Sequence, residues 1–292
     1  LWMIDVTTQR LDTVSGNTFI FRLDLGLNDL FFKYGLRVNS NLVKDIYGAP
    51  IRLASGGGRE SEYKNYPWLY YPLSSGSQVH PITTNLEVVK FEYVSAIDTL
   101  PNALQKTILL ESSPFSKLVG LPVEINMDLE IPKNLKIVNE GPNSKEFNAG
   151  RVPIAVLLEG EFPSAFENRV KPFKISNDRL KSPPNKMVVI SDGDVIKNQL
   201  DRGNPLELGF DKWTNSFYGN KEFLLNTVNY LLDDNGLINI RTKEITVPFL
   251  DPQKTIEKRT QWQIINLVLP LGLLVIFGVS FQYLRKRKYA KT

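Results

Sequence analysis

VPIAVLLEGEF, residues 152–162, and KMVVISDG, residues 186–193, are the longest continuous apolar runs before the C-terminal region. Each ends in charged or turn residues, as the buried central strands of a parallel sheet do. Shorter strands are expected at residues 1–6, 36–39, 86–94, 106–113 and 238–250. Helices are expected at 27–34, before Gly35, and at 219–234, where an apolar stripe recurs at helical spacing and Asn220 can cap the start. We therefore expect an α/β fold with an open, mostly parallel sheet.

The pattern divides the chain into four parts. Residues 1–250 form the α/β domain, 251–261 a connector, 262–284 an apolar span and 285–292 a basic tail. Within the domain, residues 54–78 are rich in Gly, Ser and Tyr and predict a long exposed loop. Residues 121–150 predict a surface insertion that begins with an alternating strand at 123–131.

Composition excludes several classes of protein. The chain has 292 residues, with 35 Lys and Arg against 31 Asp and Glu, a net charge of +4. Five of the basic residues lie in the last eight positions, so residues 1–284 carry 4 − 5 = −1, and a basic nucleic-acid-binding body is excluded. The absence of cysteine excludes a disulfide scaffold, a thiolate metal site and a cysteine nucleophile. We expect neither a cofactor nor a metal.

Residues 262–284, WQIINLVLPLGLLVIFGVSFQYL, contain no charge and predict a transmembrane helix. Trp262 and Tyr283 stand at its two ends, where interfacial aromatics are common, and Pro270 interrupts its apolar centre. The alternative is a buried helix of a soluble core. The positive flank of Arg285, Lys286, Arg287 and Lys288 predicts that this side lies in the cytoplasm.

This orientation places the domain outside the cytoplasmic membrane, in the periplasm. Because residue 1 is Leu and no signal segment precedes the first strand, we expect that an N-terminal signal or anchor helix is missing from the chain. The alternative topology is a tail-anchored protein with a cytosolic body. In either topology the partner of the span is the lipid bilayer.

Three residues are candidates for ligand binding. Asp192 and Asp194 follow a buried strand, at the edge where open α/β sheets bind ligands, and could hold a hard cation. The alternative is a turn in which Asp192 accepts hydrogen bonds from backbone amides. His80 precedes Pro81, which favours an extended backbone at this position. As the single histidine it cannot make a catalytic triad by itself, and a structural role is the alternative. No catalytic residue is expected.

Two other motifs are of a kind that can bind ligands or partners. Gly56, Gly57 and Gly58 lack the spacing of a phosphate-binding loop, and the chain has no other ATPase motif. The aromatic residues Tyr66, Trp68, Tyr70 and Tyr71, with Tyr63, could contact a partner protein, or a sugar less readily. The alternative is that they pack the loop at residues 54–78 onto the domain.

Several longer segments resemble the GldG family, the auxiliary subunits of gliding-motility ABC transporters. They are MVVISDGDVIKNQ, PLELGFDKWTNSFYGNKEFLLNTVNYLLDDNGLINIRTKEI and KRTQWQIINLVLPLGLLVIFGVSFQYLRKRKYA, with LNDLFFKYGLRVNSNLVKD, YPWLYYPL, HPITTNL and VPIAVLLEGEFPSAF earlier in the chain. The resemblance implies a periplasmic, substrate-binding-like subunit with a membrane helix at each end, which works with a separate permease and a separate ATPase. It also implies a fold similar to glutamine-amidotransferase-like, flavodoxin-like domains, without their cysteine chemistry.

Together these observations favour a membrane-anchored auxiliary subunit of an ABC transport complex, which acts by binding cargo or an envelope protein and is not an enzyme. One alternative is a membrane-tethered hydrolase that uses Asp192 and Asp194 with a metal. Another is a structural envelope scaffold, which predicts a shallow surface without a pocket.

Overall fold

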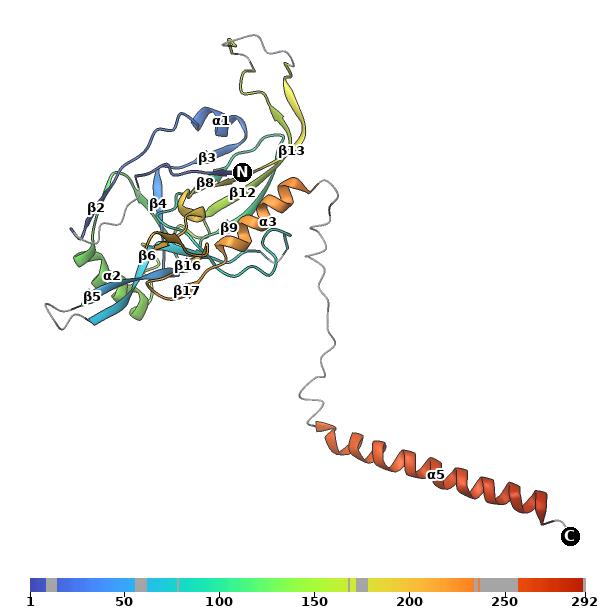
Figure 1. Ribbon diagram of the computed structural model, residues 1–292. Coiled ribbons are helices and arrows are strands. Elements are labelled where there is room, and N and C mark those ends of the chain that lie inside the picture. Colours follow the sequence, from blue (N-terminus) through green and yellow to red (C-terminus); the bar gives the residue numbers. More distant parts are fainter. Residues whose placement is uncertain are drawn as a thin grey trace. The chain divides into compact units, whose positions relative to one another are not determined.

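The computed structural model describes residues 1–8, 15–55, 62–77, 79–167, 169–171, 178–233, 236 and 257–290. The chain divides into two compact units, Leu1–Lys243 and Glu244–Thr292. The first unit, called the body below, holds the sheets and the helices α1, α2 and α3, and the second holds the long helix α5 (Figure 1).

The central sheet of the body has the strand order β1-β13-β12-β9. Its strands are β1 (Trp2–Met3), β13 (Lys181–Ile190), β12 (Pro153–Pro163) and β9 (Gln105–Glu111). Only β1 and β13 are parallel, whereas β12 is antiparallel to both β13 and β9. The strands expected at 1–6, 106–113, 152–162 and 186–193 are thus present, but the prediction of an open, mostly parallel, flavodoxin-like sheet is wrong.

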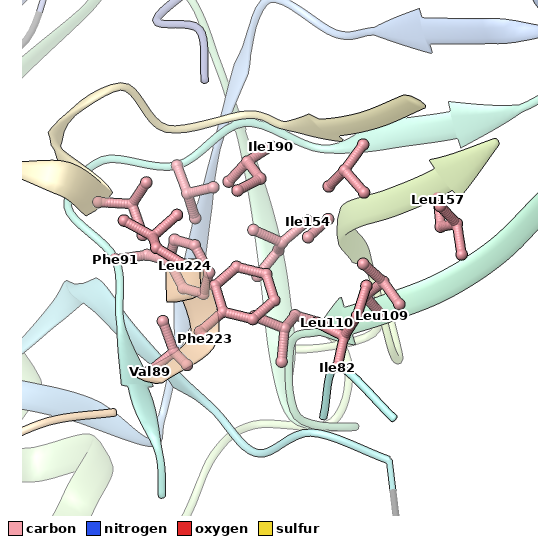
Figure 2. Close-up of a cluster of buried hydrophobic side chains, with 14 of the residues drawn as sticks. Ile82, Val89, Phe91, Leu109, Leu110, Ile154, Leu157, Ile190, Phe223 and Leu224 are labelled. Carbon is pink, nitrogen blue, oxygen red and sulfur yellow. The ribbon is translucent and has the colours of Figure 1, made fainter. Parts of the chain in front are cut away.

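The reason for this error is burial on both faces of the central sheet. Leu157 and Ile190 point into one hydrophobic cluster, which Phe223 and Leu224 of α3 complete (Figure 2). Val156, Leu158 and Val189 belong to a second cluster. Because a strand buried on both faces is apolar at every position, β12 has the continuous run typical of parallel strands, although its direction is antiparallel.

A second sheet has the order β5-β6-β7, with β5 (Gly48–Ser55), β6 (Glu62–Ser74) and β7 (Val89–Lys90). β5 and β6 are antiparallel and form a long hairpin, so the prediction of an exposed loop over residues 54–78 is wrong. The aromatic centre of β6 explains the difference, because Trp68, Tyr70 and Tyr71 belong to a third hydrophobic cluster. The strand expected at 86–94 is reduced to β7. Gly56, Gly57 and Gly58 lie outside the described residues.

The other strands form short antiparallel pairs. The pairs are β2 (Asn17–Ile20) with β11 (Val123–Asn126), β3 (Leu36–Val38) with β8 (Ile97–Thr99), β4 (Asn41–Asp45) with β10 (Ser116–Gly120), β14 (Leu200–Asp201) with β15 (Asn204–Pro205), and β16 (Phe210–Asp211) with β17 (Ser216–Phe217).

Two of the helices lie in the first half of the body. α1 (Asn28–Lys33) confirms the helix expected there, and Gly35 follows it with a left-handed φ of 76°. α2 (Met127–Glu140) replaces most of the strand expected at 123–131. The strand β11 ends at Asn126 because its side chain accepts a hydrogen bond from the Leu129 N–H at 3.0 Å, which caps the helix. β11 and α2 fill much of segment 121–150.

α3 (Asn220–Leu232) confirms the helix expected at 219–234, but the apolar stripe expected to be buried is only partly so; the stripe is Leu224, Leu225, Val228, Leu231 and Leu232. Phe223, Leu224 and Thr227 are buried, whereas Leu225 and Val228 are exposed. Asn220 is the first residue of the helix and does not cap it. Its side-chain amide bonds both the N–H and the carbonyl of Lys90, at 3.0 and 2.9 Å, which fastens the helix to β7. The strand expected at 238–250 lies outside the described residues.

α5 (Arg259–Tyr289) includes the whole apolar span at residues 262–284. It is 31 residues long, reaches a mean hydropathy of 2.4 and has no buried residue. Trp262, Pro270 and Tyr283 all lie within it, and Arg285, Lys286, Arg287 and Lys288 occupy its last turns. By length and composition, α5 could cross a membrane.

Candidate functional site

The body contains a cleft of about 780 Å³, which we call the cleft below. Its lining comes from β5, from the segment that follows the short 3-10 helix η2 (Asp194–Ile196), and from the β16–β17 hairpin, with Tyr63, Tyr71, Lys90, Glu92, Tyr218 and Asn220 between them. The volume is within the range of ordinary ligand sites in proteins. We take the cleft as the candidate site, in place of the shallow surface that the scaffold interpretation predicts.

Lys90 forms the charged floor of the cleft. Its Nζ lies 3.0 Å from Glu92 Oε1 and 3.1 Å from Asp211 Oδ2, and its side chain is only 10% exposed. The ammonium also lies 4.9 Å from the centre of the Tyr71 ring. Burial alone would lower the pKa of Lys90, but the two carboxylates raise it above its ordinary value. Lys90 is therefore a fixed cation at neutral pH.

Asp211 joins this floor to the β16–β17 hairpin. Its Oδ1 accepts the N–H of Trp213 at 3.0 Å, while Oδ2 accepts Lys90. Burial would raise the pKa of Asp211, but Lys90 holds it below its ordinary value. The hairpin is thus attached to β7 through a charged hydrogen bond, which keeps this wall of the cleft in position.

Two further cations lie at the walls of the cleft. Arg52 of β5 donates from Nη1 to the carbonyl of Trp213 at 3.0 Å and stacks on the Tyr63 ring at 5.7 Å. Lys212 donates to the carbonyl of Leu200 and lies 4.8 Å from the centre of the Trp213 ring. The carbonyl oxygens and rings that hold these two cations carry no formal charge. The positive charges of Arg52 and Lys212 can therefore still pair with a charged ligand.

Asp192 and Asp194, expected to act together, have separate environments. Asp192 is fully buried, and its two oxygens accept the N–H groups of Glu92 and Asp194, both at 2.7 Å. Burial raises the pKa of Asp192 well above its ordinary value. Asp194 lines the cleft and pairs with Lys197 at 2.9 Å. The turn interpretation therefore describes Asp192, and the two carboxylates do not form the cation site that the hydrolase interpretation requires.

The rest of the described chain provides no obvious replacement for that site: within it, no three His, Asp or Glu side chains form a group that could hold a metal ion.

His80 lies away from the residues that line the cleft. Its Nδ1 accepts the N–H of Ile82 at 3.2 Å, and its ring is 4.8 Å from the ring of Tyr230 on α3. Burial lowers the pKa of His80, while the charge of Glu159 opposes the shift. These contacts describe a neutral histidine that organises the turn before Ile82 and supports the end of α3.

The aromatic residues proposed for partner contact are mostly buried. Trp68 is fully buried, and Tyr70 and Tyr71 are 3% and 7% exposed, whereas Tyr66 is partly buried at the edge of the third cluster. Of the two interpretations of these residues, burial favours packing of the segment onto the domain. Tyr71 alone of the four reaches the cleft.

Sequence reasoning missed Lys90, Arg52, Lys212 and Trp213. A signal was present for Lys90, because a lysine inside the apolar segment VVKFEYV requires buried partners. Asp211, which is its partner, lies 121 residues away, so the pairing depends on the tertiary fold. No local pattern marks Arg52, Lys212 or Trp213.

Comparison with known proteins gives one family. A family model described as "ABC-type uncharacterized transport system" matches residues 1–227. A protein of Borreliella burgdorferi, named "Uncharacterized protein", is 22% identical over 293 residues, which cover 98% of this chain and 51% of that protein. The chain thus spans about half the length of the curated relative it matches. No solved structure matches it significantly.

Proposed function

This chain belongs to the family described as "ABC-type uncharacterized transport system", and from that premise we propose that it is an accessory subunit of an ABC transport complex. The family match over residues 1–227 is the observation that carries the proposal. The subunit contributes no nucleotide hydrolysis of its own. It works by binding, with a separate permease and a separate ATPase as its partners.

α5 holds this subunit in the membrane. Its apolar residues are exposed throughout, so they require lipid or another membrane helix around them. The basic residues Arg285, Lys286, Arg287 and Lys288 in its last turns support an orientation with this end in the cytoplasm and the body outside the cytoplasmic membrane. α5 then packs on the permease, while the body presents its cleft to cargo or to an envelope protein.

A role in gliding motility is the finer form of this proposal. The segments that resemble the GldG family support it, including the motif around Trp213 that forms one wall of the cleft. In this form the complex assembles or drives surface machinery.

The experiment that tests the proposal is affinity purification in mild detergent, followed by mass spectrometry. Wild-type protein should retain a polytopic permease and a P-loop ATPase. A matched variant keeps a span but replaces residues 263–283 with an unrelated Leu/Ala helix of equal length. This variant should stay in the membrane and lose the permease, because packing on the permease depends on the side chains of α5.

Two results would count against the proposal. Recovery of neither transporter component with the wild-type protein would remove the accessory role. Full recovery with the replaced helix would remove α5 from the permease interface. A variant of the cleft, Arg52→Gln with Lys212→Gln, serves as a control that should retain both components.

A further inference from the structure

We propose that the cleft receives an extended, acidic segment of a partner protein, which adds as a strand to the open edge of β5. The inference rests on the proposed function, since it names what the body binds. Four observations carry it, namely the free edge of β5, the course of the cleft along that edge, the charges of its walls and the exposed rings beside them.

β5 is an edge strand. It pairs with β6 on one side only, in a sheet of order β5-β6-β7. Beyond this ladder, residues 50–54 make no other backbone–backbone hydrogen bond to any part of the chain that the structure describes. Alternate N–H and carbonyl groups of an edge strand point away from its neighbour, so β5 offers the hydrogen-bonding template on which peptides assemble as added strands.

The cleft follows this open edge. Pro50, Ile51, Arg52, Leu53 and Ala54 are consecutive residues of β5, and all five line the cleft. Ile51 is buried and Arg52 is exposed, so these residues point to opposite faces of the strand. Because residues from both faces of β5 line the cleft, it borders the open edge of the strand, and Tyr63 and Tyr71 of β6 and Lys90 of β7 line it as well. Five residues correspond to about 16 Å of extended chain.

The charges of the lining select an acidic ligand. The cleft holds four cations, Arg52, Lys90, Lys197 and Lys212, against three carboxylates, Glu92, Asp194 and Asp211, which is 4 − 3 = +1. Lys90 pairs with Glu92 and Asp211, and Lys197 pairs with Asp194. Among the described residues, Arg52 and Lys212 have no ion pair. Their unpaired charges are therefore the ones that an incoming carboxylate meets.

Exposed rings flank these two cations. Tyr63 and Trp213 are 61% and 57% exposed, and they support Arg52 and Lys212 respectively. Arg52 also donates a hydrogen bond to the carbonyl of Trp213. This bond joins β5, which carries Arg52, to the β16–β17 hairpin, which carries Lys212. The rings offer apolar surface to the side chains that alternate with the acidic ones on an added strand.

The probe for the test is a displayed library of random dodecapeptides, selected against the wild-type protein and, in parallel, against the Arg52→Gln/Lys212→Gln variant. Wild-type protein should enrich peptides that carry Asp or Glu among β-branched or aromatic residues. The double variant should not enrich them. If the wild-type protein enriches no peptide, or peptides without acidic residues, the inference is wrong.

The most enriched peptide is then synthesised and its affinity is measured by fluorescence anisotropy. Neutralising Arg52 and Lys212 together should weaken binding at least tenfold. The matched control Lys64→Gln, on the same hairpin but outside the lining of the cleft, should change binding less than twofold. Thermal unfolding of both variants verifies that the body is folded.

Strand addition is tested by methylating alternate backbone amides of the peptide. Methylation in one register should abolish binding, and in the other register it should be tolerated, because only alternate N–H groups of an added strand face β5. If both registers are tolerated, the peptide does not pair with β5. The control peptide carries Gln and Asn in place of its acids, and equal binding by it would remove the role of charge.

Failure of this inference and failure of the proposed function give different results. The peptide measurements use the cleft, whereas retention of the permease and the ATPase depends on α5. Loss of peptide binding with both transporter components retained would overturn the strand addition alone.

Discussion

Residues 154–158 of β12 and the centre of α5 are both continuously apolar in sequence but have opposite surroundings. In β12, Ile154, Ala155, Val156, Leu157 and Leu158 are all fully buried between two hydrophobic clusters of the body. In α5 the corresponding apolar residues are more than half exposed, for example Leu271, Leu273 and Leu274 at 56%, 59% and 66%. The protein itself therefore buries the apolar side chains of β12, whereas it leaves those of α5 exposed to their surroundings.

Charges show the same contrast. The body buries Lys90 because it provides two carboxylates and an aromatic ring around the ammonium. α5 provides no charged partner for a charge between residues 262 and 284, and its sequence places no charge there. An apolar run alone therefore does not distinguish a core strand from a membrane span. The groups that surround the run in the folded protein distinguish the two. The predictions below test this contrast.

The largest effect is expected from charges placed in α5. Replacing Leu273 and Leu274 with lysine should cost about 5–7 kcal/mol of membrane insertion, from about 2.5–3.5 kcal/mol for each charge near the centre of a span. The chain of residues 1–292 should then leave the membrane fraction on carbonate washing. The matched Leu273→Ala/Leu274→Ala variant should stay. Retention of the lysine variant would mean that α5 does not lie in lipid.

Removing Lys90 should give the next largest effect. Lys90→Met leaves Glu92 and Asp211 without their cation, and the free energy of unfolding of the body should fall by about 3–5 kcal/mol. Adding Asp211→Asn should restore part of the loss. Lys64→Met, a change at an exposed position of the same sheet, should alter the free energy of unfolding by less than about 0.5 kcal/mol. Equal effects of the two methionine variants in denaturant titrations would contradict the role of Lys90.

A pair of identical substitutions compares the two regions directly. Leu157→Ala should lower the free energy of unfolding of the body by about 3 kcal/mol, because it opens a cavity between fully buried neighbours. Leu271→Ala in α5 should leave the stability of the body within about 0.5 kcal/mol. Denaturant unfolding, followed by circular dichroism, measures both. A large effect of Leu271→Ala would show that α5 packs on the body.

The smallest effect concerns pH. Burial lowers the pKa of His80, so the folded body favours the neutral ring, and this contribution to stability is present above the ordinary histidine value of about 6.5. Stability should therefore fall as the pH drops from about 7.5 to 5.5. Protonation of Nδ1 also removes the acceptor for Ile82.

His80→Asn keeps a side-chain acceptor but does not titrate in this range, so it should flatten the slope. Because His80 is the only histidine, the difference between the two proteins isolates its contribution. An identical slope in the variant would contradict the assignment.

The sequence predicted elements better than it predicted their arrangement. The helices at α1 and α3 and the strands β12 and β13 followed from local periodicity, because burial on one or both faces leaves a local trace. The direction of the strands left no such trace. A strand buried on both faces, such as β12, has the same apolar run whether its neighbours are parallel or antiparallel. The hairpin of β5 and β6 was missed because its glycines and tyrosines indicate a loop until Trp68 is known to be buried.

The candidate site was predicted only in part. Asp194 follows a buried strand, and it lines the cleft. The same feature could not separate it from Asp192, whose partners include the N–H of Glu92, 100 residues earlier in the chain. Lys90 and Arg52 acquire their roles from Asp211 and Trp213, which approach them only after folding.

The fastening of α3 at both ends has a mechanical consequence. At its start, Asn220 is bonded to β7 beneath the cleft. At its end, Lys186 of β13 donates to the carbonyls of Tyr230 and Asp233, both at 3.2 Å, and the Tyr230 hydroxyl donates to Glu159 of β12 at 2.9 Å. The backbone that leads to α5 leaves the helix at Asp233. The end of α3, from which the chain continues, is therefore held by β12 and β13, the longest strands of the central sheet, independently of the bonds at Asn220 in the lining of the cleft.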